Sequence, residues 1–195
     1  MLVLGIDPGT ASTGFGLARD EGGRLHAVEQ GLITTRPGVA PERRLAEIHA
    51  RIGELLDRHR PEALAIEDLY FGANVRTAFA VGQARGVVLL AAGQRGIPAR
   101  SYTPQQVKSA VCGSGRAPKE QVGRMVARLL GLDAVPTPDH VADALAVAIC
   151  ELNAAPLART IDLAGDRTRG AGAAGAGLRR REVPDALAAL ARGER

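Results

Sequence analysis

Residues 2–34, LVLGIDPGTASTGFGLARDEGGRLHAVEQGLIT, decide the fold of this chain. Residues 2–7 predict a buried strand that ends at Asp7, because the Pro-Gly pair that follows interrupts extended structure. Residues 15–19 and 25–34 predict two further strands, joined by a turn-forming Asp-Glu-Gly-Gly segment. Three consecutive strands with short turns predict an antiparallel meander at the start of the fold.

The remainder of the chain alternates between helical and extended patterns. Apolar residues recur at helical spacing in residues 41–58, whereas residues 63–67 form a short apolar run that again ends in a carboxylate. The predicted helices cover residues 41–58, 75–94, 104–112, 118–130 and 138–153, and the fifth predicted strand covers residues 97–102. This order predicts an α/β fold in which helices flank both faces of a mixed five-stranded sheet. The same order of elements is typical of the RNase H-like fold.

The composition changes after residue 153. Residues 154–195 contain twelve alanines and six glycines and few large apolar side chains. Such a segment cannot bury enough surface to offset the entropy of ordering it. The sequence therefore predicts one folded domain over residues 1–153 and a disordered C-terminal tail over residues 154–195.

Length and composition exclude several classes of protein. At 195 residues the chain is too short for a two-domain kinase, and it has no uncharged apolar run of about 18 residues, which a membrane span needs. Its first residues do not resemble a signal peptide, and Cys112 and Cys150 match no zinc pattern. We therefore expect a cytoplasmic protein that does not act at a membrane. Residues 1–153 contain 17 basic and 16 acidic residues, so net charge alone does not indicate a nucleic-acid partner.

Two carboxylates end predicted strands that we expect to be neighbours. Asp7 ends the first strand and Glu67 ends the fourth. The carboxyl ends of parallel strands meet at one edge of a sheet, where α/β proteins place ligands. Either acid alone would more often be structural, as a turn cap or in a salt bridge. Two acids at one edge would repel each other, and a hard divalent cation is the simplest partner for both.

The last predicted helix adds polar residues to an otherwise apolar segment. Asp139, His140 and Asp143 lie in its first two turns, and the spacings of three and four residues each place a pair on one helix face. Asp139 has a simple structural role at the helix N-terminus, where the dipole favours negative charge. Asp143 lies deeper and indicates a functional role, although spacing alone does not choose its companion. Asp7, Glu67, Asp143 and one neighbour could together hold two cations about 3.5–4 Å apart.

His140 admits two roles in such a site. As a ligand, its nitrogen would shift the metal preference from Mg²⁺ toward Mn²⁺. Alternatively, its ring could orient or deprotonate the attacking water.

Six motifs occur in the order that is typical of one enzyme family. They are GIDPGTASTGFGL (residues 5–17), AIEDLYF (65–71), GQARG (82–86), PQQVK (104–108), APKEQV (117–122) and DHVADALAVAI (139–149). With these motifs the chain resembles the RuvC-type crossover junction endodeoxyribonucleases, the bacterial Holliday junction resolvases, over about residues 1–152. Each motif alone has modest specificity, but the ordered set is specific.

The resemblance implies a metal-dependent active site. Asp7 and Glu67 match the first two catalytic acids of the family, and His140 and Asp143 match its two metal-site residues on the final helix. Many members carry Asp at the position of His140, and others carry His. The resemblance thus implies a nuclease with two Mg²⁺ or Mn²⁺ ions per subunit. Such an enzyme resolves four-way DNA junctions by paired symmetric nicks in recombination and DNA repair.

Five residues are candidates for contact with DNA. Tyr70 and Phe71 are adjacent aromatics just after the fourth strand, where exposed rings could stack on bases. The resemblance implies a wedge at Tyr70, whereas Phe71 could equally belong to the core. Lys108 and Lys119 are the only lysines, and the resemblance implies phosphate-binding basic residues at both positions. Arg116 lies between them in a Gly-containing loop that could approach a DNA backbone.

Gly82 and Gly86 lie four residues apart in a predicted helix, where each glycine costs roughly 1 kcal/mol relative to alanine. Such a pair indicates close approach by another element, either within one subunit or from a second subunit. The resemblance implies that this helix forms the interface of a twofold homodimer. It also implies that the RuvA-RuvB branch-migration complex is a partner.

Alternative functions share part of this pattern. An actin-like ATPase or kinase phosphate-binding domain also has a strand followed by Asp-x-Gly-Thr, as in residues 6–10, but such proteins need two domains. An RNase H-like nuclease that acts on structured RNA would share the first motif without needing the aromatic pair or the two lysines. A junction-binding architectural protein would use the same surface without catalysis.

Overall fold

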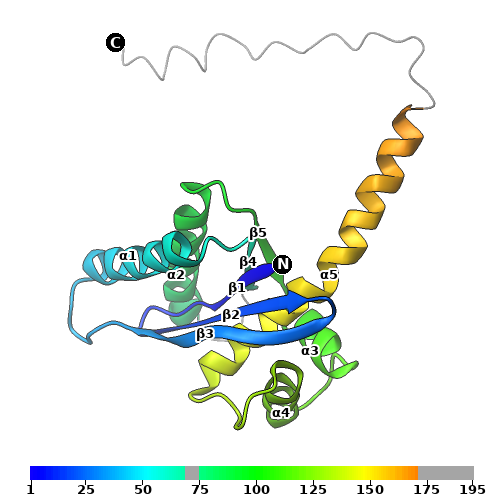
Figure 1. Cartoon of the computed structure of the whole chain (residues 1–195). Helices are drawn as coiled ribbons and strands as arrows, with labels where there is room; N and C mark the ends of the chain where they lie inside the picture. The colour runs from blue at the N-terminus through cyan, green and yellow to red at the C-terminus, as the bar shows by residue number, and fades with distance from the viewer. Residues whose placement is uncertain (69–74, 171–195) are drawn as a thin grey trace, which may run out of the picture. The chain divides into compact units, whose positions relative to one another are not determined.

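The computed structural model describes residues 1–68 and 75–170 of the chain. Its sheet contains the five predicted strands: β1 (Leu2–Asp7), β2 (Ser12–Glu21), β3 (Arg24–Thr34), β4 (Ala63–Glu67) and β5 (Ala99–Tyr102). They lie in the order β3-β2-β1-β4-β5 (Figure 1). β2 pairs antiparallel with β1 and β3, whereas β1, β4 and β5 run parallel. The predicted mixed five-stranded sheet is confirmed.

Helices cover both faces of the sheet: α1 (Pro41–His59), α2 (Val75–Gly93), α3 (Pro104–Cys112), α4 (Lys119–Leu130) and α5 (Asp139–Gly170). α1 and α2 pack on one face, and α3, α4 and the N-terminal half of α5 pack on the other (Figure 1). Thr103 caps α3 as predicted, since its hydroxyl accepts a hydrogen bond from the backbone N–H of Gln106. Within residues 1–68 and 75–170, no helix combines the length and apolar character that a membrane span requires.

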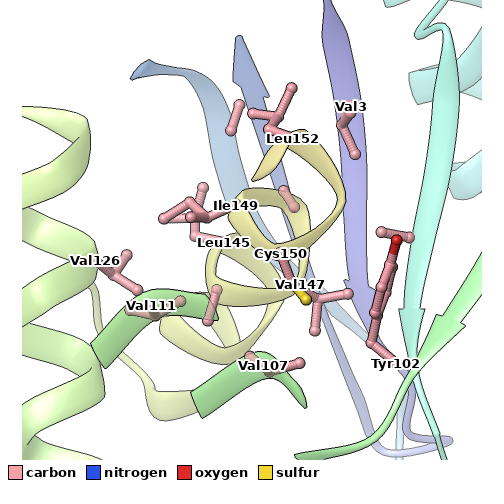
Figure 2. Close-up of a cluster of buried hydrophobic side chains, with 14 of the residues drawn as sticks. Val3, Tyr102, Val107, Val111, Val126, Leu145, Val147, Ile149, Cys150 and Leu152 are labelled. Atoms are coloured by element: carbon pink, nitrogen blue, oxygen red, sulfur yellow. The ribbon is translucent and has the colours of Figure 1, made fainter. Parts of the chain in front are cut away.

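Side chains of two sizes alternate along the three central strands. On the α1 and α2 face the strands carry large residues, as β1 does with Leu4 and Ile6. On the α5 face they carry small ones, namely Val3, Gly5, Gly14, Gly16, Ala18, Ala63 and Ala65. Figure 2 shows the cluster of buried side chains on this second face. Because alternate residues of a strand share a face, Asp7 and Glu67 also face α5.

Two elements are longer than the sequence predicts. β2 begins at Ser12 and ends at Glu21, because it pairs with β3 over that whole length and with β1 from Gly14 to Arg19, which local propensity does not reveal. α5 was predicted to end near residue 153 but continues to Gly170. Alanine, leucine and arginine have high intrinsic helix propensity, whereas the prediction considered only the lack of core-forming side chains.

Contacts within the chain divide it into two units, Met1–Ala158 and Arg159–Arg195. Every residue of the site described below belongs to the first unit. The predicted division into a domain over residues 1–153 and a tail over residues 154–195 stays a prediction.

Candidate active site

β1 and β4 bring two carboxylates to one edge of the sheet. Ile6 pairs with Ile66 in parallel register, so Asp7 and Glu67 follow at the same level on neighbouring strands. The Asp7 side chain is 15% exposed, and Glu67 is half-buried. The two acids that the sequence places at strand ends therefore lie on one face, next to α5.

α5 approaches the sheet closely because Gly5 and Gly14 have no side chain. A Cβ atom at Gly5 would lie 2.0 Å from the carbonyl oxygen of Ala144, and one at Gly14 would lie 2.0 Å from that of His140. A methyl group at either position would push the helix away. Gly14 pairs with Asp7 across β1 and β2, so the close approach occurs beside the acid.

The first two turns of α5 bring the other predicted site residues to these acids. His140 Nδ1 lies 2.6 Å from Asp7 Oδ2, although the two residues are remote in the sequence. Asp143 lies one turn further along the helix. It is the one half-buried residue in the segment from Val141 to Leu152, where every other residue is buried.

Lys119, the first residue of α4, contacts two acids in the first two turns of α5. Its Nζ lies 3.0 Å from Asp143 Oδ2 and 3.2 Å from Asp139 Oδ2. Burial lowers the pKa of Lys119, but its hydrogen bonds to Asp143 and Asp139 and their charges outweigh burial and raise the pKa overall. The Asp139 contact was missed by the sequence analysis, which assigned Asp139 to the helix dipole alone. No local pattern links α4 to α5, so no signal in the sequence indicates this pair.

Glu67 and Asp143 open into the same cavity. It has a volume of about 300 Å³ and is lined by Glu67, Pro104, Val107, Lys108, Lys119, Val122, Asp143 and Ala146. Four elements thus contribute to it, namely β4, α3, α4 and α5. The cavity brings both lysines of the chain to carboxylates that are distant in the sequence.

Burial and mutual repulsion perturb the two strand-end acids. Burial is the largest cause of the raised pKa of Asp7, and the hydrogen bond and charge of His140 lower that pKa only in part. Burial, followed by the charges of Asp7 and Asp143, raises the pKa of Glu67 to about 7, although two lysines oppose the shift. Both carboxylates would be ionised more readily beside a cation.

The chemistry of the donor set fits a hard divalent cation. Such ions prefer carboxylate oxygens, and several of them also accept an imidazole nitrogen. Over the described ranges, no three His, Cys, Asp or Glu side chains are arranged to coordinate an ion as they stand. Instead, Lys119 is paired with Asp143 and His140 with Asp7. A metal that took the same carboxylate oxygens would compete with these two contacts, in which the second oxygen of each acid takes no part.

Two arginines hold the loops that follow β1 and β4. Arg85 of α2 donates a hydrogen bond to the carbonyl oxygen of Glu67 (2.8 Å) and forms an ion pair with Asp68 (3.0 Å). Arg44 of α1 donates a hydrogen bond to the carbonyl oxygen of Thr10 (2.8 Å). Neither supporting residue was predicted from the sequence, because only the tertiary structure brings these helices to the loops. The GQARG motif, which contains Arg85, was the one signal available.

The other predicted residues that the structure describes do not line the cavity. Tyr70 and Phe71 lie outside the described residues. Arg116 is exposed in the loop between α3 and α4 and is absent from the cavity wall. Gly82 is half-buried, whereas Gly86 is exposed, and a Cβ atom at Gly86 would meet nothing within 4 Å. Gly86 therefore does not serve close packing against the part of this subunit that the structure describes.

Comparisons with known proteins match nearly all of the first unit. A family model described as "Crossover junction endodeoxyribonuclease RuvC" matches residues 3–151. The protein of that name from Moorella thermoacetica is 57% identical over 156 residues, which are 80% of this chain and 93% of the relative.

Solved structures agree with the sequence matches. The Thermus thermophilus RuvC structure has a TM-score of 0.77 and 41% identity, and the match covers 81% of this chain and 97% of that chain. T. thermophilus RuvC in complex with a Holliday junction substrate has a TM-score of 0.75 and 39% identity, over 80% of this chain and 96% of that chain. These matches confirm the predicted RNase H-like fold and the predicted resemblance. The chain belongs to the RuvC family of crossover junction endodeoxyribonucleases.

Proposed function

We propose that this protein is a structure-selective endonuclease that resolves four-way (Holliday) DNA junctions by paired symmetric nicks. The observation that carries the proposal is the convergence of Glu67, Asp143 and two lysines on one cavity, beside the Asp7–His140 pair. Membership of the family supports the same activity, and a relative has been solved in complex with a Holliday junction substrate.

A nuclease of this family uses a divalent metal. We assign the metal site to Asp7, Glu67, His140 and Asp143, and we propose two Mg²⁺ or Mn²⁺ ions per subunit. When bound, the ions neutralise the carboxylates and stabilise the negative charge that develops on the phosphodiester oxygens. The raised pKa values of Asp7 and Glu67 support the assignment, because a cation relieves the burial and repulsion that cause them.

In this proposal Lys108 and Lys119 bind the scissile phosphate. Both line the cavity that contains Glu67, one from α3 and one from α4. An ammonium group pairs with phosphate oxygens as a compact point charge. The two lysines can therefore fix the phosphate from two sides, and affinity for the junction is expected to fall as salt rises.

His140 presents one ring nitrogen for chemistry. Its Nδ1 is held by Asp7, which orients the ring and leaves Nε2 available. The side chain is 49% exposed, so water and substrate can reach it. Nε2 can accept a proton from the attacking water or serve as a nitrogen ligand. Hydrolysis is expected to leave a 5′-phosphate and a 3′-hydroxyl, which a ligase can rejoin.

A homodimer would place two such sites on one junction. On α2, Phe79 is 70% exposed and Leu90 is 54% exposed, and Gly86 leaves open space between them. Apolar side chains that recur along one exposed helix face are typical of an interaction surface. We propose that this face, with Gly82 and Gly86, forms the dimer interface.

Further parts of the proposal concern DNA contacts, partners and location. Tyr70, Phe71 and Arg116 would contact DNA, and the RuvA-RuvB branch-migration complex would be a partner. The protein would act in the cytoplasm, in recombination and DNA repair. Residues 1–153 would form the nuclease domain, and residues 154–195 would form a separate tail.

The other candidate functions have less support. An actin-like ATPase and an RNase H-like RNA nuclease share only the first of the six motifs. The family model matches residues 3–151, which include all six. Neither alternative is favoured.

Cleavage of a synthetic four-way junction tests the proposal. With Mg²⁺ or Mn²⁺, the protein is expected to nick two strands of like polarity and to leave linear duplex DNA and structured RNA intact, and a chelator should stop the reaction. Asp7→Asn should bind the junction without cutting it. Asp57→Asn is the matched control, because Asp57 is 65% exposed and pairs with Arg95. Full cleavage by Asp7→Asn, or preferential cleavage of RNA, would contradict the proposal.

A further inference from the structure

Lys119 is shared by Asp139 and Asp143 in the first two turns of α5. Its ammonium group lies 3.0 Å from Asp143 and 3.2 Å from Asp139, and it has three hydrogens to donate. The Asp143 side chain is 25% exposed and the Asp139 side chain is 76% exposed, so Asp139 lies on the solvent side of the pair. Among the described residues, these two acids are the ion-pair partners of Lys119.

Two cavities meet at this ion pair. Lys119 and Asp143 line both of them. Glu67 lines only the cavity at the strand ends, whereas Asp139 and Arg124 line only the neighbouring cavity of about 400 Å³. The ammonium group therefore borders open space on the Asp139 side.

We propose that Asp139 is a positioning residue, which holds Lys119 at the edge of the active site when a divalent cation binds Asp143. This inference rests on the proposed function, which assigns Asp143 to the metal site. An ammonium group and a divalent cation cannot share one carboxylate oxygen, because like charges repel strongly at short range. A cation that takes Asp143 Oδ2 therefore displaces Lys119 from that oxygen, and Asp139 offers an acceptor that is already 3.2 Å away.

Asp139 thereby allows Asp143 to bind the cation while Lys119 stays ordered beside the cavity. Without it, Lys119 has Asp143 as its one acid partner in the described part of the chain and competes with the cation there. With it, Lys119 keeps both its order and its positive charge beside the cavity, where the proposed function places a phosphate group. An ordered lysine loses less side-chain entropy when the phosphate binds.

Lysine-selective isotope labelling tests this inference directly. The chain contains only Lys108 and Lys119, so the spectrum has one side-chain signal for each, and Lys119→Gln assigns them. Mg²⁺ is titrated into the full chain while relaxation measures the order of the Lys119 terminus. In the unmodified protein the Lys119 signal is expected to shift and to stay ordered, whereas in Asp139→Asn it should become mobile. Asp139→Glu should restore the order, and Asp133→Asn, a change of an exposed acid outside the pair, should have no effect.

Calorimetric titration with Mg²⁺ provides the second readout. Asp139→Asn is expected to weaken Mg²⁺ affinity about threefold when Lys119 is present, which is the size expected for an exposed ion pair. In the Lys119→Gln background the same change should have little effect. An equal loss in both backgrounds would overturn the inference, because Asp139 would then act only through its charge.

Two further outcomes are decisive. If Mg²⁺ binds and Lys119 becomes mobile in the unmodified protein, Asp139 does not hold it and the inference is wrong. If Mg²⁺ neither binds nor shifts the Lys119 signal, the assignment of Asp143 to a metal site fails, and the inference fails with it.

Discussion

Glu67 and Glu151 both lie on the α5 side of the sheet, but Glu151 is enclosed by hydrogen-bond donors, whereas Glu67 lines a cavity. Glu151 of α5 is 1% exposed, and its carboxylate accepts hydrogen bonds from the Tyr102 hydroxyl (2.5 Å) and from Arg100 (3.3 Å). Glu67 pairs in register with Tyr102 on the neighbouring strand. Arg85 donates a hydrogen bond to the backbone carbonyl oxygen of Glu67. The Glu67 carboxylate itself opens into the cavity.

Glu151 therefore stabilises the fold, whereas the Glu67 carboxylate is available to bind a ligand. Burial, followed by the hydrogen bond to Glu151, raises the pKa of Tyr102, so the hydroxyl keeps its proton and remains a donor. At Glu67, burial and two neighbouring carboxylates raise the pKa to about 7 without a compensating donor. A buried acid with its partners in place stabilises the protein. An acid left without them destabilises the protein until a cation or substrate binds.

The largest effect is expected on catalysis. Glu67→Gln should lower the rate of junction cleavage by more than about a hundredfold, because even residues that only support a metal ligand contribute ten- to a hundredfold. The amide has nearly the same shape but cannot carry the negative charge. Glu151→Gln should retain most of the rate. Single-turnover cleavage at saturating junction measures both variants, and similar losses would remove the distinction between the two acids.

The effect on stability should be the reverse. Glu151→Ala is expected to lower the free energy of unfolding by about 2–4 kcal/mol, because it leaves the buried Tyr102 hydroxyl without an acceptor and Arg100 without its partner. Glu67→Gln should leave the free energy of unfolding unchanged or raise it, since it removes a carboxylate that its neighbours repel. Urea unfolding in the presence of a chelator measures both. Greater destabilisation by Glu67→Gln would show that Glu67 has a structural role.

The pH dependence of stability sharpens the same comparison. Glu67 loses its proton near pH 4.5 in the unfolded chain but near pH 7 in the folded one. Between these values the folded state binds more protons, so the free energy of unfolding falls as pH rises, by at most about 3 kcal/mol in total. Without metal, Glu67→Gln should flatten this decrease, whereas Glu151→Gln should not. Unfolding midpoints from pH 4 to pH 8 measure the slopes, and parallel curves for the unmodified protein and Glu67→Gln would refute the raised pKa.

The smallest expected effect concerns the salt dependence of DNA binding. Lys108 lines the same cavity as Glu67, so Lys108→Ala should remove one phosphate contact. The slope of log affinity against log salt should then decrease by about one, without a change in sequence preference. Arg43→Ala is the control, because Arg43 is exposed on α1, on the opposite face of the sheet. An equal change in both variants would mean that Lys108 contributes only to net charge.

Local patterns were sufficient to predict the strands and the two acids at their ends. Residues 2–7 and 63–67 each form an apolar run that stops at a carboxylate, and parallel strands align such ends. The structure pairs Ile6 with Ile66, which places Asp7 and Glu67 at the same level. The helices followed from periodicity and caps in the same way, because these signals lie within a few residues of one another.

Contacts between remote elements could not be predicted from such patterns. The Asp7–His140 hydrogen bond joins the first strand to the last helix, and the Asp139–Lys119 pair joins two helices that share no sequence pattern. The first depends on how closely α5 packs on the sheet, and the second depends on how α4 packs beside α5. Both are properties of tertiary structure. The sequence could indicate that His140 or Asp139 accompanies Asp143, but only the packing shows that one contacts Asp7 and the other Lys119.

Gly5 and Gly14 supply no functional group, yet they set the spacing between α5 and the strands. In saturation mutagenesis both positions would tolerate even alanine poorly, and they would rank beside the acids among the inactivating changes. The inactivating positions would therefore include residues at the contact between α5 and the sheet as well as the residues of the active site. Loss of activity alone would not tell the two apart, whereas a measurement of thermal unfolding on each variant would.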